Sequence, residues 1–149
     1  MGDAEAVSIL LVEDDRGLRD AYRLVLGALG LDVAGAATGE EALADVTARA
    51  PDAIVVDLGL PDLGGPALVR RLRDAAPDAA LVVLTGQEGE ELRRGCREAG
   101  ADAFLVKPVT GRELRSALDP LLGRPRPEPG RDAGGEGLGE DGRDGEPDA

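Results

Sequence analysis

Apolar residues in this chain gather in short runs that alternate with segments of helical periodicity. Five runs predict strands, at residues 7–12, 31–36, 53–56, 80–84 and 103–106. The last three are apolar throughout and only Ser8 interrupts the first, as expected of parallel strands that are covered on both faces. The run at 31–36 is weaker, so we expect it at an edge of the sheet.

The segments between these runs predict five helices. The first has apolar residues at intervals of four, three and four on one face, namely Leu18, Tyr22, Val25 and Leu29. We expect this helix to end at Gly30. Thr38 and Glu41 form a capping-box pattern that begins the second helix, and Pro51 follows its end.

The other three helices are predicted from their apolar faces. These faces comprise Leu68, Val69 and Leu72, then Leu92, Cys96 and Ala99, and finally Leu114, Leu118 and Leu121. Gly100 closes the fourth helix, and Thr110 with Glu113 caps the fifth. Strands and helices that alternate in this way predict an α/β fold, a doubly wound five-stranded parallel sheet with right-handed crossovers.

Composition divides the chain near Gly123. Residues 123–149 contain 12 Gly or Pro among 27 residues, and four arginines against eight acids. Such a segment buries too little apolar surface to offset its chain entropy. We therefore expect a folded domain at residues 1–122 and a disordered acidic tail at residues 123–149. The tail has no helix-turn-helix pattern, and the chain is either a stand-alone domain or a fragment cut in a linker.

Charge and rare residue types exclude several functions. The net charge of −13 disfavours contact with nucleic acids and anionic membranes, which need basic surface. The chain has no histidine, so a Ser-His-Asp triad and most zinc sites are excluded. Cys96 is the only cysteine, and no segment resembles a secretory signal or a membrane span. These features favour a cytoplasmic protein.

Polar residues follow four of the predicted strands. They are Glu13, Asp14 and Asp15 after the first strand, Asp57 after the third, Thr85 after the fourth and Lys107 after the fifth. Ligands of such sheets bind beyond the carboxyl ends of the strands. Clustered carboxylates repel one another unless a cation neutralises them, and their oxygens suit Mg²⁺. Lys107 is the only lysine beside 16 arginines, and its compact ammonium can pair with Asp57 or with a phosphate.

The segments ILLVEDD, VVDLGLP, VVLTG and AFLVKP resemble, in this order and spacing, the four signature blocks of the receiver domains of two-component response regulators. The resemblance covers residues 7 to about 122. It implies a flavodoxin-like receiver fold with strand order 2-1-3-4-5. It also implies a phosphorylation-controlled switch in phosphorelay signalling, and at most weak self-dephosphorylation rather than enzymatic activity.

The resemblance implies a role for each site residue. Asp57 is the expected phosphoacceptor, a carboxylate nucleophile, and Lys107 neutralises charge on the transferred group. The expected Mg²⁺ ligands are Glu13, Asp14, Asp57 and the backbone carbonyl of Gly59. Thr85 and Phe104 are the expected switch pair. The family usually has a cis peptide where this chain has Pro108.

Some positions depart from the family pattern or have a simpler interpretation. Glu13 stands where many members have Asp, so its carboxylate reaches slightly further. Gly59 and Gly86 leave no side chain beside Asp57 and Thr85, which predicts an open site with easy access for water and donor. We expect Asp15 to be an acid in the first turn of a helix.

The implied partners are proteins. A histidine kinase or phosphotransfer protein is the expected phosphodonor, and a downstream protein target is expected to bind the face formed by the fourth helix, the fifth strand and the fifth helix. Arginines that could populate this face, or simply be solvated, are Arg93, Arg94, Arg97, Arg112 and Arg115.

Three other functions fit less well. A haloacid-dehalogenase-type phosphatase needs a second aspartate two residues after the nucleophile, where this chain has Gly59. A flavin or dinucleotide binder needs a glycine-rich turn after the first strand, where VEDDRG offers acids. A receiver-like module that is not phosphorylated usually lacks a key residue, and here all are present.

Overall fold

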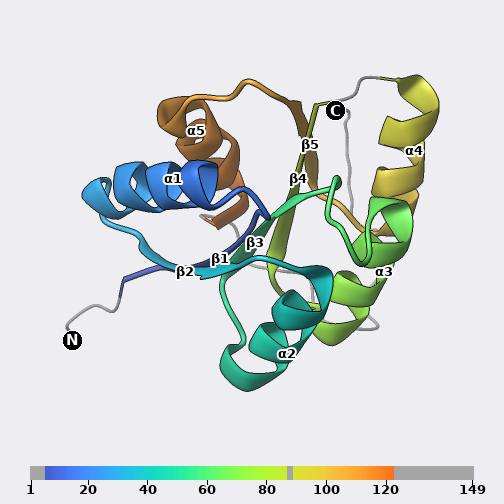
Figure 1. Cartoon of the computed structure of the whole chain (residues 1–149), viewed down its shortest axis with the longest axis horizontal. Coiled ribbons are helices and arrows are strands. Elements are labelled where there is room, and N and C mark those ends of the chain that lie inside the picture. The colour runs from blue at the N-terminus through green and yellow to red at the C-terminus, as the bar shows by residue number, and fades with distance from the viewer. Residues whose placement is uncertain (1–5, 87–88, 123–149) are drawn as a thin grey trace, which may run out of the picture.

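The computed structural model describes residues 6–86 and 89–122, and within them strands and helices alternate along the chain (Figure 1). The strands are β1 (Ser8–Val12), β2 (Asp32–Ala36), β3 (Ala53–Asp57), β4 (Ala80–Thr85) and β5 (Ala103–Val106). The helices are α1 (Arg16–Ala28), α2 (Gly39–Arg49), α3 (Gly65–Ala75), α4 (Glu90–Ala99) and α5 (Gly111–Leu122). The predicted strands are confirmed, each within one residue of its expected ends.

The strands form one parallel sheet in the order β2-β1-β3-β4-β5. Helices α1 and α5 cover one face of this sheet, and α2, α3 and α4 cover the other (Figure 1). The predicted fold class and strand order are therefore confirmed. Because all strands run the same way, the segments that follow them meet at one edge of the sheet.

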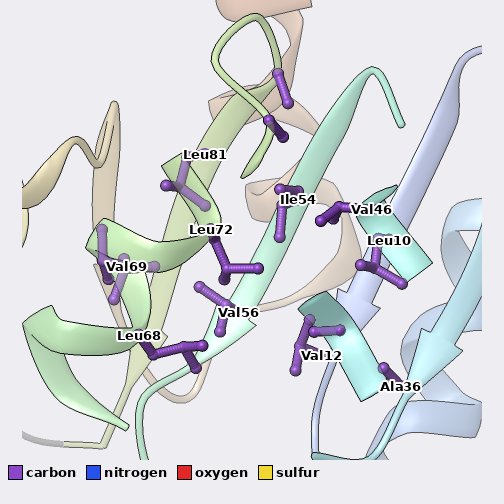
Figure 2. Packing of buried hydrophobic residues seen from close by; sticks show 14 of the residues in the cluster. Leu10, Val12, Ala36, Val46, Ile54, Val56, Leu68, Val69, Leu72 and Leu81 are labelled. Carbon is purple, nitrogen blue, oxygen red and sulfur yellow. The ribbon is translucent and has the colours of Figure 1, made fainter. Parts of the chain in front are cut away.

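Two hydrophobic clusters lie on the two faces of the sheet, because successive side chains of a strand point to opposite sides. On β1, Leu10 and Val12 join the cluster beneath α2, α3 and α4, which Figure 2 shows, whereas Ile9 and Leu11 join the cluster beneath α1 and α5. The three central strands are buried on both faces, as their apolar runs predict. The edge strand β5 is half-buried, although its run is equally apolar.

The predicted apolar face of α1 is partly wrong. Val25 was expected on this face but is 42% exposed, whereas Leu26 is fully buried. Tyr22 and Leu26 are four residues apart and so share the stripe that contacts the sheet, which places Val25 on the flank of the helix.

The predicted helix ends are confirmed, except that the capping box of α2 is not reciprocal, because the Glu41 carboxylate accepts from the Ala37 N–H and not from that of Thr38. The Thr38 hydroxyl accepts a hydrogen bond from the Glu41 N–H at 3.1 Å at the start of α2. At the start of α5, Thr110 and Glu113 each bind the other's backbone N–H, at 2.8 and 3.0 Å. Gly100 ends α4 with a φ of 122°, in the left-handed region that favours glycine. Among the described residues, no helix is both long and apolar enough to cross a membrane.

Candidate functional site

Four strands deliver polar residues to the carboxyl edge of the sheet. Asp57 is the last residue of β3 and Thr85 the last residue of β4, while Glu13 and Lys107 directly follow β1 and β5. The register of the strands sets how far each of these residues lies along the strand direction, since Asp57 pairs with Leu84, one residue before Thr85. The structure therefore brings together the polar residues that the sequence places after separate strands.

Three carboxylates form the acidic part of the site. Glu13, Asp14 and Asp57 each offer an oxygen, and these oxygens lie within 4.8 Å of one another. Glu13 and Asp57 are buried and Asp14 is exposed, so the cluster opens to solvent on one side. Like charges this close repel, and a hard divalent cation with oxygen ligands relieves the repulsion. The donor set thus fits Mg²⁺.

Lys107 closes the buried side of the cluster. Its ammonium lies 2.9 Å from Glu13 Oε1 and 3.5 Å from Asp57 Oδ2. The sequence suggested Asp57 or a phosphate as the partner, and the closer contact with Glu13 was missed. The longer side chain of Glu13 gives it this reach.

Burial and charge act in opposite directions on these groups. Burial raises the pKa of Glu13, although the bonds from Lys107 and from the Asp15 N–H partly oppose the rise. Burial alone would lower the pKa of Lys107, but Glu13 and Asp57 outweigh it and raise the pKa above its ordinary value. Lys107 is therefore a fixed positive charge at neutral pH.

The β1–α1 loop is held by side chains of α1 and its cap. Asp15 was expected in the first turn of this helix but is its N-cap, and its carboxylate accepts from the Leu18 N–H at 3.0 Å. Arg19 donates from Nη1 to the Glu13 carbonyl oxygen at 2.7 Å. The sequence does not predict this second contact, because it links an ordinary helix arginine to a loop carbonyl.

Glycines flank the site, as predicted. The Gly59 N–H donates to Asp57 Oδ1 at 3.3 Å. A Cβ at Gly59 would lie 3.8 Å from Asp57 Oδ2, whereas one at Gly86 would have no atom within 4 Å. The missing side chain at Gly59 therefore leaves space beside the Asp57 carboxylate, and Gly86 borders open space.

The expected switch pair lies on neighbouring strands. Thr85 is buried, and its carbonyl accepts from the Lys107 N–H at 2.8 Å. Phe104 is half-buried, and the Arg93 guanidinium carbon lies 4.7 Å from its ring centre, a cation–π contact that the sequence did not reveal. The Lys107–Pro108 peptide is cis, as the resemblance implies.

Known proteins resemble this chain in sequence. A family model described as "Response regulator receiver domain" matches residues 9–119. Response regulator MprA of Mycobacterium tuberculosis (strain H37Rv) is 38% identical over 123 residues, which cover 83% of this chain and 54% of that protein. MprA of Mycobacterium sp. (strain KMS) is also 38% identical, over 127 residues that cover 85% and 55%. The chain spans about half the length of these curated relatives.

Solved structures agree with the sequence matches. A CheY-like receiver domain protein from Methanospirillum hungatei superposes with a TM-score of 0.76 at 30% identity, covering 79% of this chain and 94% of that chain. A response regulator protein from Burkholderia pseudomallei, solved with a phosphorylated aspartic acid, a calcium ion and citrate, gives 0.73 at 29% identity, covering 78% and 68%.

Proposed function

This chain belongs to the response regulator receiver domain family and is a phosphoacceptor of two-component signalling, and from this premise we propose that Asp57 is the residue that takes the phosphoryl group. A histidine kinase is the kind of phosphodonor that such a receiver implies. The observation that carries the proposal is that Asp57 lies beside two other carboxylates and 3.5 Å from the Lys107 ammonium.

In the proposed step, an Asp57 carboxylate oxygen attacks the phosphorus of the donor. An acyl phosphate bond forms, and the bond from phosphorus to the donor's leaving atom breaks, with the electron pair leaving on the donor. Phosphoryl transfer needs mainly positioning and charge neutralisation. Lys107 supplies a fixed ammonium next to Asp57 Oδ2, so it stabilises negative charge on that side.

The acidic cluster is typical of the metal site of receivers. The proposed Mg²⁺ ligands are Glu13, Asp14, Asp57 and the Gly59 carbonyl. When bound, Mg²⁺ would supply the charge neutralisation that three carboxylates and an incoming phosphate need. The single charge of Lys107 offsets only one of the three carboxylates, so a net negative charge remains for the metal, which can approach from the exposed Asp14 side.

The proposed output is a change of the face formed by α4, β5 and α5. The Thr85 hydroxyl would turn toward the phosphoryl group, and Phe104 would turn into the space it leaves. A downstream protein target would read this change on the same face. Of the arginines expected there, Arg115 has its own partners, namely Asp119 at 2.7 Å and the Leu29 carbonyl at 2.7 Å.

An apolar groove beside the site suits the phosphodonor. The groove has a volume of about 440 Å³, and it runs between α1 and the β5–α5 loop. Its lining is Leu18, Ala21, Tyr22, Val25, Lys107, Pro108, Val109 and Gly111. Because Lys107 belongs both to this lining and to the site, an apolar helix of the donor seated here would hold its phosphoryl group near Asp57.

A Val25→Asp change tests this groove, because it places a charge in the apolar lining. Phosphoryl transfer from a protein donor should then become slower, whereas transfer from a small phosphodonor should keep its rate.

The test of Asp57 is incubation with Mg²⁺ and a small acyl phosphate, followed by intact mass measurement. We expect one phosphoryl adduct on the native chain and none on Asp57→Asn. Equal labelling of both chains would refute the assignment.

The lifetime of the adduct tests the prediction of an open site. A loss of the phosphoryl group that is faster than in receivers with bulky residues at the positions of Gly59 and Gly86 would support it.

We also propose that the receiver domain occupies residues 1–122, although residues 123–149 lie outside the described residues. The family match to residues 9–119 supports this boundary. A chain truncated after Leu122 should take up the phosphoryl group at the rate of the full chain. A truncated chain that fails to fold would place the boundary further along the sequence.

A further inference from the structure

The β3–α3 loop, residues 58–64, is fastened to the start of a neighbouring helix. Asp62 Oδ1 accepts a hydrogen bond from the Gly39 N–H at 2.9 Å, and Oδ2 accepts from the Glu40 N–H at 3.0 Å. Gly39 and Glu40 are the first two residues of α2, and N–H groups at that position have no partner within their own helix. A carboxylate from another loop thus does the work of an N-cap side chain.

Packing reinforces this attachment. Gly39 is buried, and a Cβ added to it would lie 3.0 Å from Leu63 Cβ, so the loop tip closely approaches the helix start. The two ends of the loop also meet, because a Cβ on Gly64 would overlap the Leu58 carbonyl oxygen. The loop is therefore closed at its base and fixed at its tip, and Gly59 lies between these two points.

The attachment is charged at neutral pH. The backbone N–H of Gly39, and to a lesser extent that of Glu40, hold the pKa of Asp62 below its ordinary value. A negative charge at the start of a helix also interacts favourably with the helix dipole. Asp62 consequently stays ionised, and both of its oxygens remain acceptors.

We propose that Asp62 is a positioning residue for the metal site, an inference that rests on the proposed function. Asp57 is held by its strand, whereas Gly59, the proposed carbonyl ligand, is held by the loop and by the 3.3 Å bond from its own N–H to Asp57 Oδ1. Releasing the loop tip from α2 would let Gly59 move while Asp57 stays in place. Loss of Asp62 should therefore weaken Mg²⁺ binding and leave the phosphoacceptor itself intact.

The chain offers a matched control at the same helix end. Thr38 caps α2 through the Glu41 N–H, and it belongs to the β2–α2 segment and not to the β3–α3 loop. Asp62→Ala and Thr38→Ala thus both remove a cap from α2, but only Asp62→Ala releases the loop. Asp62→Asn is a conservative variant that retains one oxygen acceptor.

The experiment measures Mg²⁺ binding by calorimetry and the rate of phosphorylation by a small acyl phosphate across a Mg²⁺ titration. We expect Asp62→Ala to raise the Kd for Mg²⁺ by about tenfold, the lower end of what the loss of an outer-shell partner costs. Its rate at saturating Mg²⁺ should return to that of the native chain. Asp62→Asn should show a smaller rise in Kd, and Thr38→Ala no change despite a lower melting temperature.

Two results would overturn the inference while the proposed function stands. One is a Kd for Mg²⁺ that is unchanged in Asp62→Ala, and the other is an equal rise in Thr38→Ala. If the native chain neither binds Mg²⁺ nor takes a phosphoryl group on Asp57, the proposed function itself fails. Should Asp62→Ala not fold, the comparison of Asp62→Asn with Thr38→Ala decides in the same way.

Discussion

The contacts of Lys107 illustrate what single residues contribute. Its identity as the only lysine, and its position after β5, identified it in the sequence as the cation of the site. Its preference for Glu13 over Asp57 depends on tenths of an ångström between three segments, which no local pattern encodes. Residue type was predictable here, and the choice of partner was not.

The pH dependence of stability tests the Asp62 contact. Because the folded state lowers the pKa of Asp62, the contact stabilises the protein above the ordinary aspartate pKa of about 3.9, and this stabilisation is lost as pH falls through the lowered pKa. We expect Asp62→Asn to be less stable than the native chain at neutral pH. Chemical denaturation should show the difference shrinking in acid, and a difference that is constant with pH would contradict the prediction.

The thiol of Cys96 should be protected from reagents. Cys96 is fully buried in the cluster beneath α4, and burial raises the pKa of its thiol. Only the thiolate reacts, and only when the chain opens. We expect Ellman's reagent to modify the folded chain about a thousandfold more slowly than the denatured chain. Similar rates in both states would show that α4 opens readily.

At the scale of elements, Arg73 connects four segments. From α3, its guanidinium donates to the carbonyls of Ala76, Pro77 and Ala79 before β4, to the Gly100 carbonyl at the end of α4, and to the Asp102 carboxylate before β5. Asp102 in turn accepts from the Leu81 N–H at 2.9 Å. This network fixes the C-terminal end of α4 at the amino edge of the sheet, opposite to the site.

Removal of Arg73 should therefore destabilise the fold. Arg73→Ala leaves several half-buried carbonyls and one carboxylate without this donor, and we expect a loss of about 2–3 kcal/mol in the free energy of unfolding. The control is Arg70→Ala on the same helix, which removes one exposed bond to the Glu98 carbonyl and should cost under about 0.5 kcal/mol. Equal losses in urea denaturation would refute the role of the network.

Elements were more predictable than the contacts between them. Apolar runs and capping pairs such as Thr110 with Glu113 are local signals, so strands and helix starts appear in the sequence itself. The α1 face was harder, because Val25 and Leu26 are both apolar and only packing decides which is buried. Arg73 and Asp62 were missed because their partners lie in distant segments.

At the scale of the whole molecule, excess negative charge predicts that Mg²⁺ stabilises the fold. The chain carries a net charge of −13, and three of its acids lie within one site. A ligand that binds only the folded state adds about 2.7 kcal/mol at a concentration of 100 times its Kd. Thermal melting with Mg²⁺, compared with sodium chloride of equal ionic strength, measures this effect apart from general screening.

The Asp14→Asn variant distinguishes Mg²⁺ binding at the acidic cluster from a general effect of the ion on the charged surface. This variant should melt at a higher temperature than the native chain without Mg²⁺, because it relieves repulsion within the acidic cluster. It should also lose most of the stabilisation by Mg²⁺. Full stabilisation of Asp14→Asn would mean that the ion acts elsewhere on the surface.

The presence of a single lysine offers a chemical handle. Apart from the α-amino group, Lys107 Nζ is the only primary amine that an acylating reagent could modify, and it lies next to two carboxylates. These carboxylates raise the pKa of the amine, so it stays protonated and reacts slowly with such reagents. The speed of lysine labelling, followed by mass spectrometry, would thus report directly on the electrostatic state of the pocket, without any added fluorophore or engineered tag.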